Sequence, residues 1–317
     1  MTTSSRIILA VTLIFAGLIL FFVVASCFEW DFSGLFGANY TEKEYEITES
    51  FNNISITTKT ADITVLPSED GKTSVIFYEK NSLTHNVKAD GDSLKIELDD
   101  QRPWYERILN FPSPSITVYL PEGEYGNLLI KSNTGDVEIK DGFTFSEIDI
   151  SLNTGDVKCC SSTKGALKIE SSTGDVFLEK LTAAAVYISV STGDISASEI
   201  NSRGAFTTKV STGDTSLFNV LCESFYSQGS TGDLELSSLV ANGKIEIERS
   251  TGDVKLKSCD GSEIYIKTDT GNISGSLLSD KIFITSTNTG KINVPKSTSG
   301  GICELHTDTG NIAISVE

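Results

Sequence analysis

The chain has 317 residues, and its 25 Lys and Arg against 43 Asp and Glu give a formal net charge of −18. This acidic balance excludes a nucleic-acid partner, because phosphate binding needs clustered lysine and arginine, and it disfavours adhesion to anionic lipid. Only two histidines occur, so a three-histidine metal site is excluded as well. We expect both of them, His85 and His306, at the protein surface.

Residues 7–25, IILAVTLIFAGLILFFVVA, form an uncharged apolar stretch near the N-terminus. A helix of this length spans about 28 Å, which is close to the hydrocarbon thickness of a bilayer. Arg6 precedes the stretch and acidic residues follow it, so the positive-inside rule places residues 1–6 in the cytoplasm and the bulk of the chain outside. We therefore expect an uncleaved signal anchor over residues 7–26, in a single-pass protein of the cell membrane.

Two other interpretations of this segment stay open. A cleaved secretory signal is disfavoured, because the apolar cores of such signals are usually shorter. The residues before Cys27, Val-Ala-Ser, resemble a bacterial lipobox, in which Cys27 would be lipidated and the protein would be a lipoprotein. Residues 27–40 are rich in aromatic side chains, and we expect them to form a juxtamembrane linker at the bilayer interface.

A repeat of 19 or 20 residues dominates the second half of the chain, and each unit contains a Thr-Gly pair. A nearly fixed period of this length is typical of a solenoid. Glycine at this point of each unit supplies a turn conformation that a side chain would resist. The expected structural turns are at Gly135, Gly155, Gly174, Gly193, Gly213, Gly232, Gly252, Gly271, Gly290 and Gly310.

Apolar and polar side chains alternate on both sides of each glycine, as in Val176 and Leu178 after Gly174. This is the period of a strand with one buried face, and stacked units bury a continuous core. Each unit is thus a strand, a corner, a second strand and a more variable return. The sequence predicts an all-β fold: a single-stack parallel β-helix, or β-solenoid, with coils of about 19.5 residues, right-handed by the crossover rule and preceded by one transmembrane helix.

The region over residues 41–125 lacks the full corner but contains strand patterns. Residues 54–56 and 60–65 resemble a degenerate first coil, and Asp90-Gly91 predicts a hairpin turn. We expect an N-terminal β cap over 41–125 and the repeats over 126–317. No separate cap follows Gly310, which leaves open a poorly protected last coil and end-to-end self-association.

These features together resemble a bacterial β-strand-repeat family of membrane-anchored envelope proteins, described as adhesin-like and LiaG-like. The residues that carry the resemblance are the N-terminal anchor, Ile63–Pro67, the segment 116–123 and the repeated Ser/Asn-Thr-Gly-Asp-Val units. The resemblance covers residues 45–317. It implies a non-catalytic, membrane-tethered β-helix, and it brings no catalytic residue set.

Acidic residues follow most of the turn glycines. Carboxylates on adjacent coils about 5 Å apart would suit calcium or a retaining glycosidase pair. Equivalent acids lack the unequal environments of an acid and a base, however, and the nonapeptide of calcium-binding β-rolls is absent. We therefore prefer turn capping, keep calcium as a weak alternative and expect no other cofactor. The corner acids are Asp136, Asp156, Asp175, Asp194, Asp214, Asp233 and Asp253.

The cysteines are Cys27, Cys159, Cys160, Cys222, Cys259 and Cys303. Cys159 and Cys303 fall at inward positions of the repeat, and Cys259 occupies a slot that aliphatic residues fill in other units. Buried free thiols are therefore expected in place of disulfides or a structural metal site.

Tyr187, Tyr226 and Tyr265 occupy the same slot, six residues before the glycine, and so are expected to share one outward face. With no unique catalytic cluster, the sequence favours a non-enzymatic, membrane-tethered binding or adhesion module outside the cytoplasm, whose ligand is a surface glycan or protein. One alternative is an accessory protein that regulates an envelope-stress signalling system or a transporter. Another is a polysaccharide-active enzyme on a β-helix.

Overall fold

The computed structural model describes residues 14–15, 17–19, 21–22, 40–80, 83–100 and 114–317. Within these ranges no helix is long and apolar enough to cross a membrane. Most of the expected anchor over 7–26, Cys27 of the lipobox and nearly all of the linker over 27–40 lie outside the described residues. The anchor and the location in the cell membrane therefore stay predictions.

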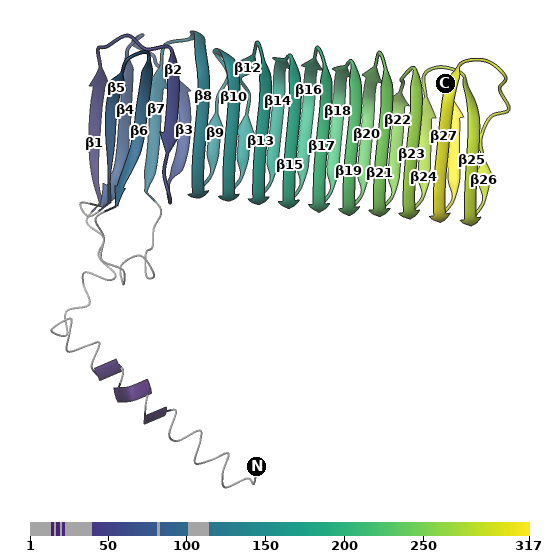
Figure 1. The fold of residues 1–317 in the computed structure, drawn as a ribbon, viewed down its shortest axis with the longest axis horizontal. Helices are drawn as coiled ribbons and strands as arrows, with labels where there is room; N and C mark the ends of the chain where they lie inside the picture. The colour runs from purple at the N-terminus through teal and green to yellow at the C-terminus, as the bar shows by residue number, and fades with distance from the viewer. Residues whose placement is uncertain (1–13, 16, 20, 23–39, 81–82, 101–113) are drawn as a thin grey trace.

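The repeats form a solenoid whose coils stack in one row, with two sheets facing each other across the core (Figure 1). The first sheet runs in the spatial order β1 (Tyr40–Ile47), β4 (Thr73–Lys80), β7 (Ser115–Leu120), β3 (Asp62–Pro67), β9 (Val137–Ile139), β11 (Val157–Cys159), β14 (Val176–Ala183), β16 (Ile195–Ser202), β18 (Thr215–Cys222), β20 (Leu234–Ala241), β22 (Val254–Cys259), β24 (Ile273–Leu277), β28 (Ile312–Val316) and β26 (Ile292–Asn293).

The second sheet faces the first. From the C-terminal end of the stack its order is β25 (Lys281–Thr289), β27 (Gly301–Thr309), β23 (Glu263–Thr270), β21 (Lys244–Thr251), β19 (Ser224–Thr231), β17 (Ala205–Thr212), β15 (Ala185–Thr192), β13 (Ala166–Thr173), β10 (Phe143–Thr154), β8 (Gly123–Thr134), β2 (Asn53–Thr57), β6 (Ser93–Asp100) and β5 (Leu83–Asp90), and β12 (Ser162–Thr163) pairs with β10. The prediction of an all-β parallel solenoid is confirmed.

Columns of apolar side chains fill the space between the sheets. Ile150, Ile169 and Ile188 lie side by side on β10, β13 and β15, and all three are fully buried. Burying one such side chain contributes about 1.5–3 kcal/mol, and each coil adds several. A single coil has no second layer to cover it, so the stack is stabilised by the contact between neighbouring coils.

The Thr-Gly corners form a second column along one edge. Gly174 and Gly193 have φ angles of 130° and 139°, which residues with a Cβ rarely adopt. A Cβ at Gly193 would also collide with the carbonyl oxygen of Gly174. Glycine is therefore required twice at the corner, for its backbone conformation and for the close approach of the next coil.

The second strand of each central coil contains a bend at a residue with positive φ, which the alternation pattern did not predict. Lys180 has a φ angle of 53°, and the equivalent residues Glu199, Asn219 and Ser238 have values between 53° and 56°. Two successive outward residues therefore separate the buried Leu178 from the next inward residue of β14. The sequence contained a signal for it: in β14 the buried residues are spaced by two up to Leu178, then by three to Leu181, and by two again.

Antiparallel strands lie at the N-terminal end of the solenoid. Strands β2 and β3 form the degenerate first coil, because they pair in parallel with β8 and β9. Strand β4 runs antiparallel to β1 and β7, and β5 and β6 form the predicted hairpin, in which Asp90 is opposite Ser93. Antiparallel strands end the parallel stack here, so the repeat does not continue past this end.

The prediction that His85 lies at the surface was wrong. Its side chain is buried in the cap, where Nδ1 lies 2.8 Å from Glu79 Oε2 and Nε2 lies 3.0 Å from Thr58 Oγ1. The His85 backbone N–H also donates to Glu79 Oε2, and Lys43 Nζ contacts Glu79 Oε1 at 3.1 Å. The Phe77 ring stacks on the imidazole. This polar cluster makes burial tolerable, because each buried group has a partner. His306 is only partly buried, near Asp308.

The coils at the C-terminal end do not stack in chain order, contrary to the simple sequential repeat. The coil β27–β28 lies between β23–β24 and β25–β26, so the later segment is inserted beneath the earlier one (Figure 1). Gly310 accordingly stacks on Gly271, and Gly290 stacks on Gly310. The physical reason is burial: Leu305 on β27 takes the fully covered position, whereas Thr285 on β25 faces the open end.

The coil β25–β26 therefore covers the one that follows it in sequence. Its own outer side leaves Ile282, Ile284 and Ile292 exposed by 39%, 51% and 44%. Unpaired strand edges with apolar side chains can pair with another chain. End-to-end self-association stays a prediction, for which sedimentation velocity over a range of concentrations is the measurement.

Candidate ligand-binding face

The three tyrosines lie on one outward face of the second sheet. In the register between neighbouring strands, Tyr187 on β15 is opposite Thr207 on β17, which is opposite Tyr226 on β19. Tyr226 is opposite Glu246 on β21, which is opposite Tyr265 on β23. The tyrosines thus alternate with other residues, one on every second coil. Adjacent strands are about 4.8 Å apart, so the rings recur about every 10 Å along the solenoid.

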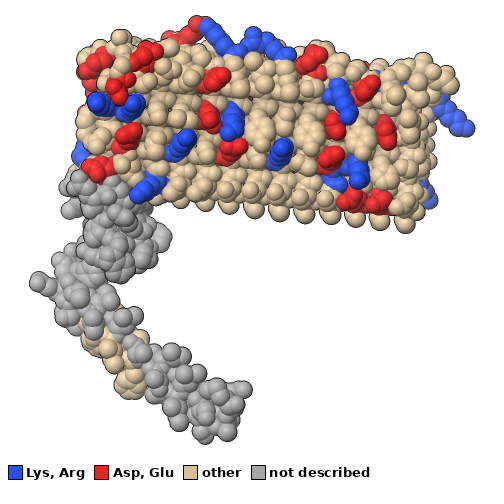
Figure 2. Space-filling model, in the orientation of Figure 1, with Lys and Arg blue, Asp and Glu red and all other residues tan. Residues whose placement is uncertain are grey.

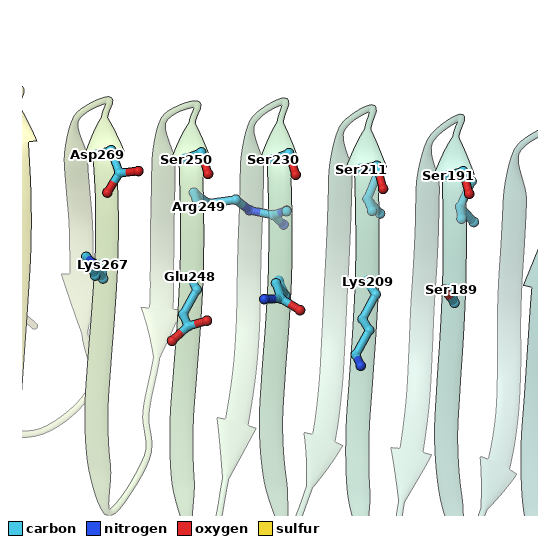
Figure 3. Close-up of a pocket in the computed structure, with 14 residues that line it drawn as sticks. Ser189, Ser191, Lys209, Ser211, Ser230, Glu248, Arg249, Ser250, Lys267 and Asp269 are labelled. Carbon is cyan, nitrogen blue, oxygen red and sulfur yellow. The ribbon is translucent and has the colours of Figure 1, made fainter. Parts of the chain in front are cut away.

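A shallow hollow of about 490 Å³ lies on the same five strands, between the tyrosines and the Thr-Gly corners. Figure 3 shows its side chains in two rows. Ser191, Ser211, Ser230 and Ser250 form the row near the corners, which Asp269 continues. The second row contains Ser189, Lys209, Gln228, Glu248 and Lys267. The hollow therefore presents hydroxyl groups and charges of both signs over five coils.

Charged side chains sit close to the tyrosine rings. Lys209 Nζ lies 5.8 Å from the ring centroid of Tyr187, and Lys244 Nζ lies 5.5 Å from that of Tyr265. Both distances are within the range of a cation–π contact. Partial burial, followed by the nearby carboxylates of Glu248 and Glu246, raises the pKa of Tyr226. Figure 2 shows lysines and acidic residues interspersed on the visible face, so no large field of one sign dominates it.

The corner acids form a separate ladder along the edge of the solenoid. Oδ1 of each accepts a hydrogen bond from the backbone N–H of the corresponding residue on the next coil, as between Asp175 and the Asp194 N–H at 2.8 Å. The ladder begins at Asp62 of the degenerate coil and continues past Asp253 to Asn272 and Asn311. The same bonds join Asp136, Asp156, Asp175, Asp194, Asp214, Asp233 and Asp253. All of these acids serve one structural role, and none differs from the rest as an acid–base pair would require.

This role gives a first prediction. Asp194→Ala removes the acceptor for the Asp214 N–H, and we expect a loss of about 1 kcal/mol in the free energy of unfolding. Asp194→Asn keeps an acceptor, as Asn272 does naturally, so its stability should stay within about 0.5 kcal/mol of wild type. Urea unfolding compares the two. Equal losses in both variants would show that the charge, and not the hydrogen bond, matters.

Calcium at this ladder stays a weak alternative. Among the residues that the structure describes, no group of three or more His, Cys, Asp or Glu side chains is arranged to hold a metal ion. A urea titration of wild type with calcium and with chelator is the measurement that decides it.

The repeated corners, the ladder and the degenerate first coil allow comparison with known families. A family model described as Toastrack, DUF4097, matches residues 51–205 and 182–317. The chain belongs to the Toastrack family. This bears out the expected relationship to a β-repeat family of adhesin-like proteins. No relative is found among curated proteins.

Three solved structures show low similarity to this Toastrack chain. A proposed adhesin from Bacteroides fragilis is 16% identical, with coverage of 87% of this chain and 97% of the other and a TM-score of 0.40. A proposed lipid-binding protein from Parabacteroides distasonis is 15% identical, with 88% and 98% coverage and a TM-score of 0.48. A proposed cell adhesion protein from Clostridium sporogenes is 11% identical, with 88% and 100% coverage and a TM-score of 0.28. These similarities are too low to assign a function.

The described cysteines of this Toastrack chain are free thiols, as expected, and Cys27 lies outside the described residues. Cys159, Cys222, Cys259 and Cys303 are buried, whereas Cys160 is half-buried. Burial raises the pKa of Cys159, Cys222 and Cys303 to about 12. At neutral pH this leaves about a thousandth of the thiolate that an exposed cysteine has.

Two results are expected from these buried thiols. In native protein at about pH 7.5, iodoacetamide should react with Cys160 and hardly with Cys159, Cys222 or Cys303. Peptide mass spectrometry measures the labelling of each cysteine.

The second result concerns stability against pH. A raised pKa means that the folded state holds the thiol proton more tightly than the unfolded chain does. The stability that this gives is therefore complete below the ordinary thiol value of 9.0 and is lost as pH rises from there to about 12. Fast labelling of Cys159 in folded protein would contradict the packing.

The tyrosines of this Toastrack face follow from the spacing in the sequence, whereas its serine row and Arg249 were not predicted. The serine row had a signal, because Ser precedes Thr-Gly in five consecutive units, from Ser172 to Ser250, and the last four of these serines form the row. Arg249 also had a signal, since it stands in an inward column that Val190 and Val210 fill on other coils.

Proposed function

We propose that this chain is a non-enzymatic binding module of the bacterial envelope that binds a linear polysaccharide on the outer face of β15, β17, β19, β21 and β23. The observation that carries the proposal is the placement of Tyr187, Tyr226 and Tyr265 on alternate coils beside a hydroxyl-lined hollow. In this proposal the solenoid lies outside the cytoplasm and is tethered to the membrane through residues 7–25.

The spacing of the rings supports an extended sugar chain. A repeat of about 10 Å between rings is close to the length of a disaccharide unit in an extended β-1,4-linked polysaccharide. Aromatic side chains offer an apolar face with a polar tip, which suits the face and the hydroxyl edge of a sugar ring. The serine row and Gln228 then supply donors and acceptors for the hydroxyl groups on the other side of the chain.

The stiffness of the solenoid supports binding of an extended ligand. The face lies on hydrogen-bonded strands over buried columns, so its side chains are held at fixed intervals before binding. Preorganisation of this kind reduces the entropy cost of association. The uniform corner acids and the shallow, open shape of the hollow are features of a binding surface and do not suggest bond cleavage.

The experiment uses the full-length chain and a β-1,4-linked hexasaccharide of N-acetylglucosamine in isothermal titration calorimetry. Replacing Tyr187, Tyr226 and Tyr265 together with Ser should weaken binding at least about a hundredfold, since each stacked ring is worth about 1 kcal/mol or more. The tyrosines are half-buried and outward, so the urea midpoint should change little. Unchanged affinity in the triple variant would overturn the assignment of this face.

A register variant provides the matched control. Tyr187→Thr combined with Thr207→Tyr keeps the composition of the row but moves one ring by a single coil, about 4.8 Å along the solenoid. If the spacing determines recognition, this variant should bind as weakly as Tyr187→Thr alone. Full affinity would show that the number of rings matters and their interval does not.

A further inference from the structure

Arg249 is a buried cation that also lines the inner side of the hollow. Arg249 is 4% exposed and lies on β21. It belongs to the inward column that contains Val190 on β15 and Val210 on β17. Figure 3 shows the side chain extended from β21 across to the neighbouring strand β19. The space there is free because that strand has Gly229 in the column, and a methyl group at Gly229 would collide with Arg249 Nη1.

Only one part of the guanidinium has a partner among the described residues. Nη2 donates to Ser227 Oγ at 3.0 Å, and Ser227 Oγ also accepts from Thr208 Oγ1 at 2.9 Å. Nε and Nη1 are buried and have no hydrogen-bond partner, and the carboxylates of Asp214 and Asp233 attract the charge without forming a hydrogen bond to it. Buried donors without an acceptor are unfavourable, so this arrangement favours a further partner.

A third unpartnered atom belongs to the coil that precedes the coil of Gly229. Thr215 Oγ1 is buried without a partner, and Thr215 follows the corner of the coil β17–β18. The Arg249 guanidinium lies beside Gly229 on β19. Gly229 pairs with Val210 on β17, and Val210 and Thr215 stand on the two sides of the same Thr-Gly corner. Three of the four buried side-chain atoms without partners in the described chain thus belong to this corner. Such a concentration of unsatisfied polar groups favours a ligand that accepts hydrogen bonds there.

We propose that the interior corner between the coils β17–β18 and β19–β20 binds a small monovalent anion of the halide class, held by Arg249 Nε and Nη1 and by the hydroxyl of Thr215. A halide accepts hydrogen bonds and neutralises the charge, whereas water does only the first. Serine, threonine and glycine replace aliphatic residues at Ser227, Thr208 and Gly229, so the core becomes polar where the anion binds.

The charge state of Arg249 agrees with this site. Burial lowers the pKa of its guanidinium to about 10, while the more distant carboxylates of Asp214 and Asp233 raise it. Arginine is therefore still protonated at neutral pH, so an anion would be attracted to it there. Asp214 and Asp233 lie at the exposed corner and are engaged in the acid ladder.

The test is thermal unfolding of the full-length chain in sodium chloride and in sodium gluconate at equal ionic strength. Chloride should raise the midpoint of wild type by about 3 °C, because an anion that binds only the folded state stabilises it. Arg249→Gln and Arg249→Met should show the same midpoint in both salts. Lys209→Met, which removes an exposed cation from the same sheet, should keep the full dependence on chloride.

Each outcome bears directly on the proposal. Equal wild-type midpoints in chloride and gluconate would overturn it and leave water as the partner of Arg249. An unaltered dependence on chloride in either Arg249 variant would also overturn it, by locating the halide elsewhere. If neither variant folds, Thr215→Val is used in their place, and it should reduce the chloride-induced shift by at least half. An unreduced shift in Thr215→Val would contradict the site.

Discussion

Gly193→Ala is expected to lower the free energy of unfolding by about 3 kcal/mol or more. Gly193 has a φ angle of 139°, outside the range that an alanine adopts without strain. The added Cβ would also collide with the carbonyl oxygen of Gly174 on the preceding coil. The backbone of one coil must therefore move away from the next, which disturbs the ladder of hydrogen bonds on both sides of the corner.

Gly71→Ala is the matched control for this prediction. Gly71 also has a positive φ angle, 74°, but a Cβ there would meet nothing within 4 Å. Its expected cost is that of backbone strain alone, about 1 kcal/mol. Urea unfolding of the two variants separates strain from collision. Similar losses at both positions would show that coil stacking is looser at the corner than the structure implies.

Glu79→Ala is expected to cost about 3–5 kcal/mol, the second large effect. Glu79 is fully buried, and its carboxylate accepts from Lys43 Nζ and from the His85 backbone N–H and contacts His85 Nδ1. Removing it leaves the buried His85 without its carboxylate partner in the core of the cap, whereas Lys43 is about one third exposed and can turn to water. The cap would then unfold more easily and expose the first coil of the solenoid.

The control for Glu79 is Glu46→Ala. Glu46 also forms an ion pair with a lysine, at 2.7 Å to Lys72 Nζ, but both side chains are more than half exposed. An exposed pair contributes about 0.2–1 kcal/mol, so the variant should unfold close to wild type. Chemical denaturation measures both changes. A loss at Glu79 no larger than that at Glu46 would contradict a structural role of the buried cluster.

The solenoid could be predicted because its physical cause repeats in the sequence. The same inward positions and the same corner recur in every unit. Single residues that depart from the pattern, such as Arg249 in an apolar column, therefore do not hide the period. The chain order of the last coils could not be predicted in this way. Both terminal segments fit the repeat, and only the difference between Leu305 and Thr285 in apolar character shows which one takes the covered position.

The candidate site was predicted in part, for a related reason. Spacing alone placed the three tyrosines on one face, because residues at the same position in each unit become neighbours in the stack. The burial of His85 depends on Glu79, six residues earlier in the cap, and that of Arg249 depends on Gly229, one coil earlier in the same column. The repeat period links Gly229 with Arg249, which share one column, but no periodic signal links Glu79 with His85, because the cap does not repeat.

The central claim is that the tyrosine face binds a linear polysaccharide of the envelope. Co-sedimentation of the full-length chain with purified cell-wall material, in calcium and in chelator, tests it most directly. We predict saturable pelleting of wild type in both conditions and its loss when Tyr187, Tyr226 and Tyr265 are replaced with Ser. Absence of pelleting by wild type, or equal pelleting by the triple variant, would contradict the claim.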